Sequence, residues 1–181
     1  MDWWTEHFTG SGSATYYAHT LILETGATVS SIACNYLSLT HYLDLSKATR
    51  RWRLAGSMQL RNSIYTNEHW WGFFTNPTAP TITENHFGWR ILNAQLYASC
   101  GNGANGTQTD TGITYALDDE HYLVIVTEAA AIKYYVDNVL KATITTNLPA
   151  SGNLTVSCWI QTAGASNKGL GISNFFAWTE E

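Results

Sequence analysis

The sequence has little charge and few cysteines. Only 13% of its 181 residues are charged, roughly half the usual share for a globular protein. Its 3 cysteines, Cys34, Cys100 and Cys158, lie far apart and form no Cys-x-x-Cys pair. These features argue against a disulfide framework and a structural zinc site, and they predict buried thiols.

Basic residues are scarcer than acidic ones: 9 Lys and Arg stand against 14 Asp and Glu, for a net charge of −5. Because binding to phosphates needs a basic surface, we expect no nucleic-acid partner. Five of the basic residues fall within 47–61. There Arg51 and Arg53 alternate with Trp52 and Leu54, which favours a solvated or salt-bridged sheet face over contact with RNA or lipid.

Long hydrophobic runs are absent as well. No segment approaches the roughly 18 consecutive apolar residues that a membrane helix needs, so we expect no membrane insertion. The first seven residues, Met-Asp-Trp-Trp-Thr-Glu-His, are acidic and aromatic where a signal peptide would be basic and then aliphatic. We therefore expect the chain to be made in a cytoplasm and not to be secreted.

Residues that fit a pleated sheet are abundant. Aromatic residues make up 13% of the chain, including 8 Trp and 10 Tyr, and the 45% of hydrophobic residues is enough for one ordered core. Alternating segments separated by Gly, Asn, Ser and Thr predict strands at 15–23, 31–37, 51–60, 70–74, 87–92, 95–99, 122–127, 131–136, 140–145, 154–161 and 172–179. Only 43–47 and 128–131 hint at a helical turn, and the glycine-rich segment 100–112 is predicted to be a loop or a hairpin crossing. The sequence thus predicts a single all-β domain over residues 1–181, built as a two-sheet antiparallel sandwich.

The segment 131–146 gives the most specific local prediction. Asp137-Asn138 is expected to form a hairpin turn, because both residues tolerate the left-handed conformation. A two-residue turn would pair Val136 with Val139, whereas a longer loop or a bulge shifts the register by one residue. We expect the shifted register, because it gathers every aliphatic side chain on one face. Its pairs would be Val136 with Leu140, Tyr134 with Ala142, and Ile132 with Ile144.

This hairpin resembles one found in concanavalin-A-like (laminin-G-like) jelly rolls. The segment Ile132–Thr143 is similar to the family's Phe-Tyr-Val-Asp-Gly-Val-Leu hairpin, with Asn138 where the family usually has Gly. Other segments resemble its neighbouring strands: 70–75, 87–91, 95–99, 121–126 and 172–178. The resemblance implies a concanavalin-A-like jelly roll, and the departure at Asn138 leaves the turn type open.

Two further segments, 23–31 and 145–149, look most like the jelly-roll modules of phage and other viral structural proteins. Such modules decorate capsids or sit on tails or fibres, and they often face host glycans. The resemblance therefore implies a non-enzymatic structural and adhesion module on a virion surface. Its expected partners are other virion proteins or further copies of itself in a homo-oligomer, together with host surface glycans. A free lectin-like carbohydrate-binding module is the main alternative.

Several members of this fold hydrolyse glycans, which requires two facing carboxylates, about 5–5.5 Å apart in retaining enzymes. The resemblance would place them on a strand with alternating acids, Glu-x-Asp-x-Glu, and no Glu-x-Asp occurs in the chain. The acidic cluster Asp118-Asp119-Glu120 directly precedes a predicted strand and fits a solvated turn. We predict no catalytic residues, and a divergent glycoside hydrolase is the less favoured alternative.

No metal and no cofactor are expected. The six histidines show neither the His-x-His nor the His-x-x-x-His spacing that favours a metal. Calcium held by loop carboxylates of Asp110, Asp118 and Asp119 is the alternative, since the fold allows it.

Tryptophans are the better indication of a function, because sugars stack on aromatic rings. Trp70 and Trp71 are adjacent on a predicted strand and must point to opposite faces. Two alternatives stay open: one of them lies in the core and the other is exposed, or both are buried, and burial of both is favoured. Together with Tyr65 and His69 they form the candidate glycan-binding set. Four others are expected in the core: Trp52, Trp89, Trp159 and Trp178.

The N-terminal residues 1–12 are a candidate arm. Trp3 and Trp4 precede Gly10-Ser11-Gly12, and an exposed pair of indoles invites aggregation unless something covers it. We therefore predict that Trp3 and Trp4 contact a neighbouring subunit.

Overall fold

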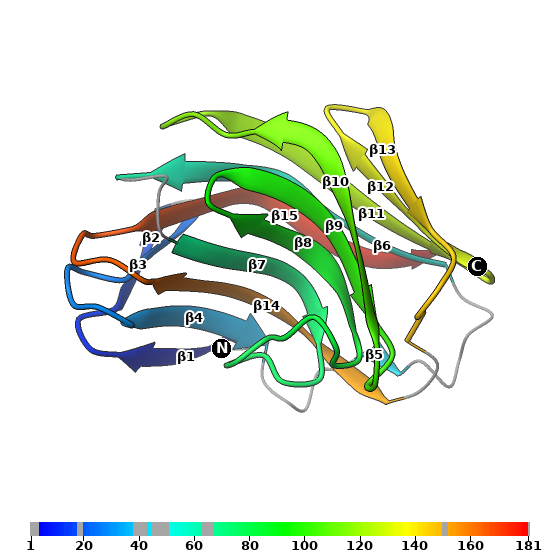
Figure 1. Cartoon of the computed structure of the whole chain (residues 1–181), viewed down its shortest axis with the longest axis horizontal. Coiled ribbons are helices and arrows are strands. Elements are labelled where there is room, and N and C mark those ends of the chain that lie inside the picture. Colours follow the sequence, from blue (N-terminus) through cyan, green and yellow to red (C-terminus); the bar gives the residue numbers. More distant parts are fainter. Residues whose placement is uncertain are drawn as a thin grey trace.

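The computed structural model describes residues 4–17, 20–37, 43–44, 51–62, 67–149 and 152–180. In these ranges the chain forms fifteen strands in two antiparallel sheets, which Figure 1 shows stacked as layers. None of the described residues belongs to a helix that could cross a membrane. The predicted all-β, two-sheet antiparallel sandwich is confirmed.

The first sheet has eight strands. Their order is β1 (Trp4–Thr9), β4 (Ile32–Leu37), β14 (Asn153–Thr162), β7 (Asn67–Phe74), β8 (His86–Leu92), β9 (Gln95–Gly101) and β10 (Gly106–Thr114), with β5 (Leu43–Asp44) paired to β14. The second sheet has seven strands. Their order is β13 (Val139–Ile144), β12 (Ala131–Val136), β11 (Glu120–Glu128), β6 (Arg51–Arg61), β15 (Gly169–Glu180), β3 (Thr20–Glu24) and β2 (Ser13–Tyr17).

Two indoles fill the space between the sheets. Trp71 and Trp89 lie opposite each other on β7 and β8, and both are completely buried. A Cβ atom at Gly56 of β6 would lie 3.2 Å from the Trp71 ring, so the glycine lets this ring reach the facing sheet. The Trp89 ring meets Tyr134 of β12 edge to face at 5.1 Å, and the Tyr134 hydroxyl donates to the Ser99 carbonyl at 2.6 Å. These contacts tie the two sheets together.

The β12–β13 hairpin combines the two predicted registers. Asp137 and Asn138 have φ values of 50° and 66° and form a two-residue turn, with Val136 opposite Val139. A bulge at Tyr134/Tyr135 then restores the predicted pairs, Tyr134 with Ala142 and Ile132 with Ile144, which are confirmed. The predicted pairing of Val136 with Leu140 is wrong. Leu140 lies opposite Tyr135 instead, and it is 49% exposed because the bulge turns it outward.

The segment 15–23 was predicted as one strand and forms two. β2 and β3 pair with each other, with Tyr17 opposite Thr20. Before the reversal the even-numbered residue Ala14 packs on the core, and after it the odd-numbered residues Leu21 and Leu23 do. The phase of the alternation therefore differs between β2 and β3, which is consistent with two strands in place of one regular strand.

The glycine-rich segment 100–112 contributes to a hairpin, the second of its two predicted alternatives. β9 runs to Gly101, and β10 begins at Gly106 and pairs with β9. Neither hint of a helical turn is confirmed for described residues: 43–44 form β5, and 128–131 form the tight β11–β12 hairpin. Residues 45–47 lie outside the described ranges.

Residues 4–9 belong to the sheet and do not form an arm. β1 pairs along its whole length with β4, from Trp4 opposite Leu37 to Thr9 opposite Ile32. The Trp4 ring packs edge to face on Phe175 of its own chain at 5.7 Å. Trp3 lies outside the described residues, and the subunit contact stays a prediction.

Seven tryptophans fall within the described ranges, and four of them were expected in the core. Trp89 and Trp159 are buried, and Trp52 is half-buried against the core. Trp178 is 39% exposed, so that expectation is wrong. A register shift between Ser173 and Phe176 changes the alternation of β15 and turns Trp178 outward. The three cysteines are free and buried, as predicted.

Two buried histidines make the stability of this fold depend on pH. Burial lowers the pKa of His69 from 6.5 to about 3 and that of His86 to about 4. Between these values and 6.5, both rings take up a proton only in the unfolded chain. The free energy of unfolding should therefore fall as the pH is lowered through this window, by about 1.4 kcal/mol per pH unit for each histidine.

His69→Leu should remove one of these two contributions. Neither ring nitrogen of His69 has a hydrogen-bond partner among the described residues, so leucine breaks no bond. Urea unfolding at several pH values should show a shallower pH slope for this variant, and Ile91→Val, next to it in the core, should keep the wild-type slope. An unchanged slope in His69→Leu would contradict the assignment.

Candidate functional site

One row of directly opposite residues crosses the outer face of the eight-stranded sheet. From β1 to β10 it runs His7, Cys34, Trp159, Trp70, Arg90, Tyr97 and Asp110. Opposite residues of paired strands share a face. Since Trp71 faces the core, its neighbour Trp70 and the rest of this row face away from it.

The β7–β8 connection, residues 75–85, covers one half of the row. The Pro77 carbonyl accepts hydrogen bonds from Cys34 Sγ at 3.1 Å and Ser157 Oγ at 2.9 Å. The Thr78 carbonyl accepts one from Trp159 Nε1 at 3.0 Å. Burial raises the pKa of the Cys34 thiol to about 12, so it keeps the proton that it donates. Cys34 and Trp159 form a buried cluster with Trp70 and Phe74.

A single carboxylate organises this connection. Glu84 accepts the backbone N–H groups of Asn76 at 2.7 Å and Thr81 at 2.8 Å, and the Thr75 hydroxyl at 3.0 Å. Burial raises the pKa of Glu84, although these three bonds oppose the shift. The Glu84 side chain thus holds the two ends of the connection together. The carbonyls of Pro77 and Thr78 remain available to the side chains of the sheet beneath.

The other half of the row is open and centres on Arg90. Its Nε donates to Glu68 Oε1 at 2.7 Å, and its Nη1 donates to Gln108 Oε1 at 3.0 Å. Its Cζ lies 5.1 Å from the centroid of the Trp70 ring, and Trp70 Nε1 donates to the same Glu68 oxygen at 2.8 Å. The side chains of Arg90 and Glu68 are 13% and 27% exposed. We call Glu68, Trp70, Arg90 and Gln108 the Arg90 cluster.

Polar and aromatic side chains surround the Arg90 cluster. The half-buried Tyr97 lies opposite Arg90 on β9, and Gln161 of β14 lies opposite Glu68. The amide nitrogen of Gln108 is buried and has no partner among the described residues. Asp110 is exposed, and its Oδ1 accepts from Gln95 at 2.7 Å and from the Gly112 N–H at 2.7 Å. Hydrogen-bond donors and acceptors therefore lie beside an aromatic ring on an open sheet face.

Among the described residues that were predicted to bind glycans, Trp70 belongs to this cluster, and Trp71 and His69 do not. Of the two alternatives for Trp70 and Trp71, the favoured one holds, since both are 0% exposed. Trp71 lies between the sheets, whereas Trp70 faces outward and is covered by Arg90 and by its buried neighbours. His69 faces the core, opposite Ile160 and Ile91, and is also fully buried. Tyr65 lies outside the described residues.

Sequence reasoning missed Arg90, Glu68 and Gln108. The alternation on β7 could have indicated that Glu68 shares a face with Trp70, two residues on. The position of Arg90 opposite Trp70 depends on the register across the 75–85 connection, which no local pattern specifies.

The structure describes no cluster that could hold a metal. In the ranges given above, no three His, Cys, Asp or Glu side chains lie together as candidate ligands. Two of the predicted calcium ligands have local backbone partners: Asp110 accepts from Gly112, and Asp119 accepts from the Ala116 N–H at 2.7 Å. Asp118, the third, has a positive φ of 64°. Binding of calcium is not tested by these observations.

Solved structures share this fold. The carbohydrate recognition domain of Emp47p has a TM-score of 0.73 at 11% identity, over 100% of this chain and 90% of that one. An alginate lyase from a Corynebacterium species gives 0.63 at 9%, over 96% and 83%. A glycosidic hydrolase gives 0.67 at 11%, over 94% and 89%. No protein-family model and no curated protein sequence matches the chain.

These similarities show that the chain has the concanavalin-A-like jelly-roll fold, as the hairpin resemblance implied. Identities this low carry over no individual residue. The same fold serves a carbohydrate recognition domain, a lyase and a hydrolase, so it does not by itself separate binding from catalysis.

The Arg90–Glu68 pair should be coupled more strongly than a surface ion pair. Both side chains are mostly buried and share Trp70, so a double-mutant cycle of Arg90→Ala and Glu68→Ala should give about 1–2 kcal/mol of coupling in urea unfolding. The Arg51–Glu128 pair is the control, since its Arg51 side chain is 52% exposed, and its coupling should be smaller. Equal coupling in the two pairs would show that the Arg90 cluster is not preorganised.

Proposed function

We propose that this protein is a non-catalytic carbohydrate-binding module, and that a neutral oligosaccharide binds at the Arg90 cluster. The observation that carries the proposal is the Glu68–Arg90–Gln108 network over the Trp70 ring. Its members hold one another by bonds of 2.7–3.0 Å on the open half of the sheet face. A site in which polar groups are fixed before the ligand arrives loses less entropy on binding.

The chemistry of the cluster suits sugar hydroxyls. Each hydroxyl can both donate and accept, and the cluster offers a guanidinium and amide groups beside a carboxylate. Tyr97, opposite Arg90, supplies a half-buried ring on the same face. Rings of this kind stack on the apolar faces of sugars while neighbouring polar groups fix their orientation.

The charge balance favours a neutral ligand. The positive charge of Arg90 is already paired with the carboxylate of Glu68 at 2.7 Å. A carboxylate or sulfate on the sugar would have to compete with Glu68 for the guanidinium, and it would approach an overall negative protein. Uncharged hydroxyls can add to the network without breaking the pair.

The same residues support binding rather than hydrolysis. The central strands β7, β8, β9 and β14 carry one carboxylic acid between them, Glu68. Its Oε1 already accepts from Arg90 and Trp70. Glycoside hydrolysis commonly uses one carboxyl group as an acid and a second one as a nucleophile or base.

The setting that we propose is a virion surface, where further copies or other virion proteins would add avidity to weak individual sites. This part rests on the sequence resemblance to viral modules alone, and the three solved structures named above do not add to it. A free lectin-like module would use the same site in the same way.

Binding to a glycan array tests the site. The wild-type protein should bind a subset of neutral oligosaccharides, and Arg90→Ala should weaken this binding by about tenfold or more, the equivalent of one charge-assisted hydrogen bond. Arg51→Ala, on the other sheet, is the matched control and should bind as the wild type does. The unfolding midpoint of each variant verifies that it is folded.

Three results would contradict the proposal. Arg90→Ala could bind as tightly as the wild type, or only acidic glycans could bind. Alternatively, the wild type could release new reducing ends or unsaturated sugars from a bound polysaccharide while Arg90→Ala does not. That result would make the cluster part of an active site.

A further inference from the structure

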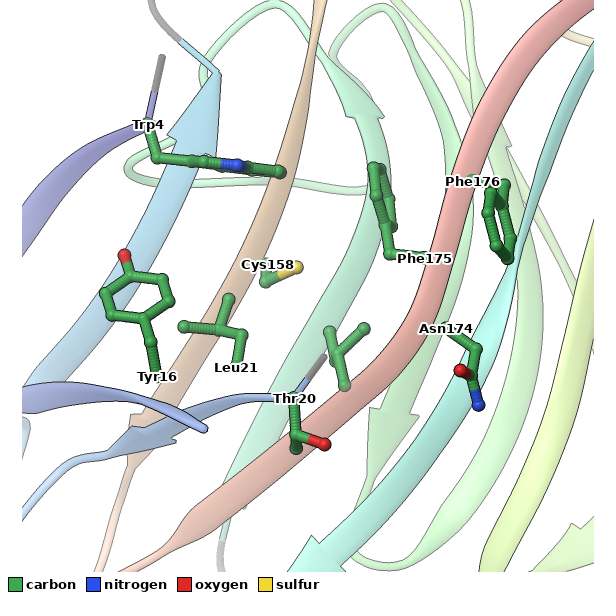
Figure 2. Close-up of a pocket in the computed structure, with 9 residues that line it drawn as sticks. Trp4, Tyr16, Thr20, Leu21, Cys158, Asn174, Phe175 and Phe176 are labelled. Atoms are coloured by element: carbon green, nitrogen blue, oxygen red, sulfur yellow. The ribbon is translucent and has the colours of Figure 1, made fainter. Parts of the chain in front are cut away.

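The cavity between the two sheets specifies no ligand. It has a volume of about 310 Å³, and Figure 2 shows Trp4, Tyr16, Leu21 and Phe175 among the side chains around it. The Trp4 and Phe175 rings already pack against each other at 5.7 Å. None of the described side chains that line the cavity has a buried polar atom without a partner. Reactive chemistry lies elsewhere, in the turn between β9 and β10.

This turn contains the two Asn-Gly pairs of the chain, Asn102-Gly103 and Asn105-Gly106. In such a pair the backbone nitrogen of the glycine can attack Cγ of the asparagine side chain, because no Cβ on the glycine hinders its approach. Both asparagines are exposed, so water reaches both pairs. The two pairs differ in what holds the glycine.

Gly106 is held in place. The Asn105 carbonyl accepts the Asn102 N–H at 3.0 Å, which fixes the peptide that joins Asn105 to Gly106. A Cβ atom at Gly106 would lie only 2.0 Å from the Ile82 carbonyl oxygen, so the backbone there is packed against the β7–β8 connection. The rotation that brings the Gly106 nitrogen to the Asn105 side chain would break this hydrogen bond and this packing.

Gly103 has the freedom that Gly106 lacks. A Cβ atom at Gly103 would approach no atom closer than 3.4 Å, where it would meet the Asn85 side chain. Gly103 has a φ of 91°, and its N–H makes no hydrogen bond to another residue within the described ranges. The peptide between Asn102 and Gly103 can therefore rotate without losing a bond or a close contact of its N–H.

The Asn102 side chain is also activated for attack. Its Oδ1 accepts the backbone N–H groups of Ala104 at 3.1 Å and Asn105 at 2.9 Å. When a nitrogen attacks Cγ, negative charge develops on Oδ1, and donors that already point at this oxygen stabilise it. The same two bonds hold the side chain over the peptide of Gly103, which favours a reactive geometry.

We propose that Asn102 modifies itself: the Gly103 nitrogen attacks Asn102 Cγ and forms a succinimide. The new N–Cγ bond replaces the Cγ–Nδ2 bond, and the amide nitrogen leaves as ammonia with the proton of the Gly103 N–H. Water then opens the ring at either carbonyl and leaves aspartate or isoaspartate, so no oxidant, reductant or cofactor is needed. Each conversion adds one negative charge to the net charge of −5. This modification does not depend on glycan binding.

Incubation of the folded full chain at mildly alkaline pH, followed by tandem mass spectrometry of its peptides, tests the proposal. Base removes the proton of the attacking nitrogen, so the conversion should accelerate as the pH rises. In the native protein, Asn102 should be converted at least about tenfold faster than Asn105. In urea the turn is lost and both pairs should react at similar rates, so the ratio in urea is the reference for the effect of the fold.

Two matched variants serve as controls. Asn102→Ser keeps an oxygen that can accept from the turn but has no amide to lose, so it should abolish the conversion at this position. Asn105→Ser keeps the N–H that donates to Asn102 Oδ1, so Asn102 should react as it does in the wild type. Equal ratios in the native and the unfolded wild type would overturn the proposal. So would faster conversion of Asn105, or an Asn102 that stays intact while the unfolded chain reacts.

Discussion

The approach of the Trp71 ring to Gly56 on the facing sheet is the contact on which the rest of this structure depends. It sets the distance between the sheets at the centre of the sandwich, and it fixes which residues of β7 point inward. Because side chains alternate along a strand, Trp70 must then point outward. The Trp70 ring lies on a face that would otherwise meet water. The 75–85 connection covers the buried cluster of Cys34, Trp70, Phe74 and Trp159, and the Arg90 guanidinium lies above the Trp70 ring.

These two kinds of cover divide the outer face of the eight-stranded sheet into a closed half and an open half. Over Cys34, Ser157 and Trp159 the donors of the sheet are satisfied by carbonyls of the 75–85 connection, so no group there is free to meet a ligand. Around Arg90, in contrast, the side chains of the sheet satisfy one another through the Arg90–Glu68 and Arg90–Gln108 bonds. Side chains can rearrange to admit a ligand hydroxyl more easily than a loop held by the half-buried Glu84 can, so recognition is expected on the open half.

Much of the fold could be predicted from periodicity, and much of the site could not. Eight of the eleven expected strands lie within β6–β9, β11, β12, β14 or β15, and those at 31–37 and 140–145 overlap β4 and β13, because alternation is a local property. The division of the segment 15–23 into β2 and β3 was missed because no glycine, proline or asparagine stands between Tyr17 and Thr20, although the change in the phase of the alternation indicates it. The burial of Trp70 and the identity of Arg90 as its cover depend on a connection that returns over the sheet. Such a return is a tertiary feature with no signature in the residues that it covers.

Buried polar groups without a partner separate packed regions from binding regions in this protein. Among the described residues, the indole nitrogens of Trp71 and Trp89 and the ring nitrogens of His69 lack partners inside the core, where the surrounding side chains leave no path for a ligand. Gln108 Nε2 also lacks a partner, but Gln108 belongs to the Arg90 cluster on the outer face of the sheet. In the core, the cost of an unmade hydrogen bond is offset by dense packing of large rings. Gln108 lies in the proposed glycan site, so its amide is the group whose energy a bound molecule could lower.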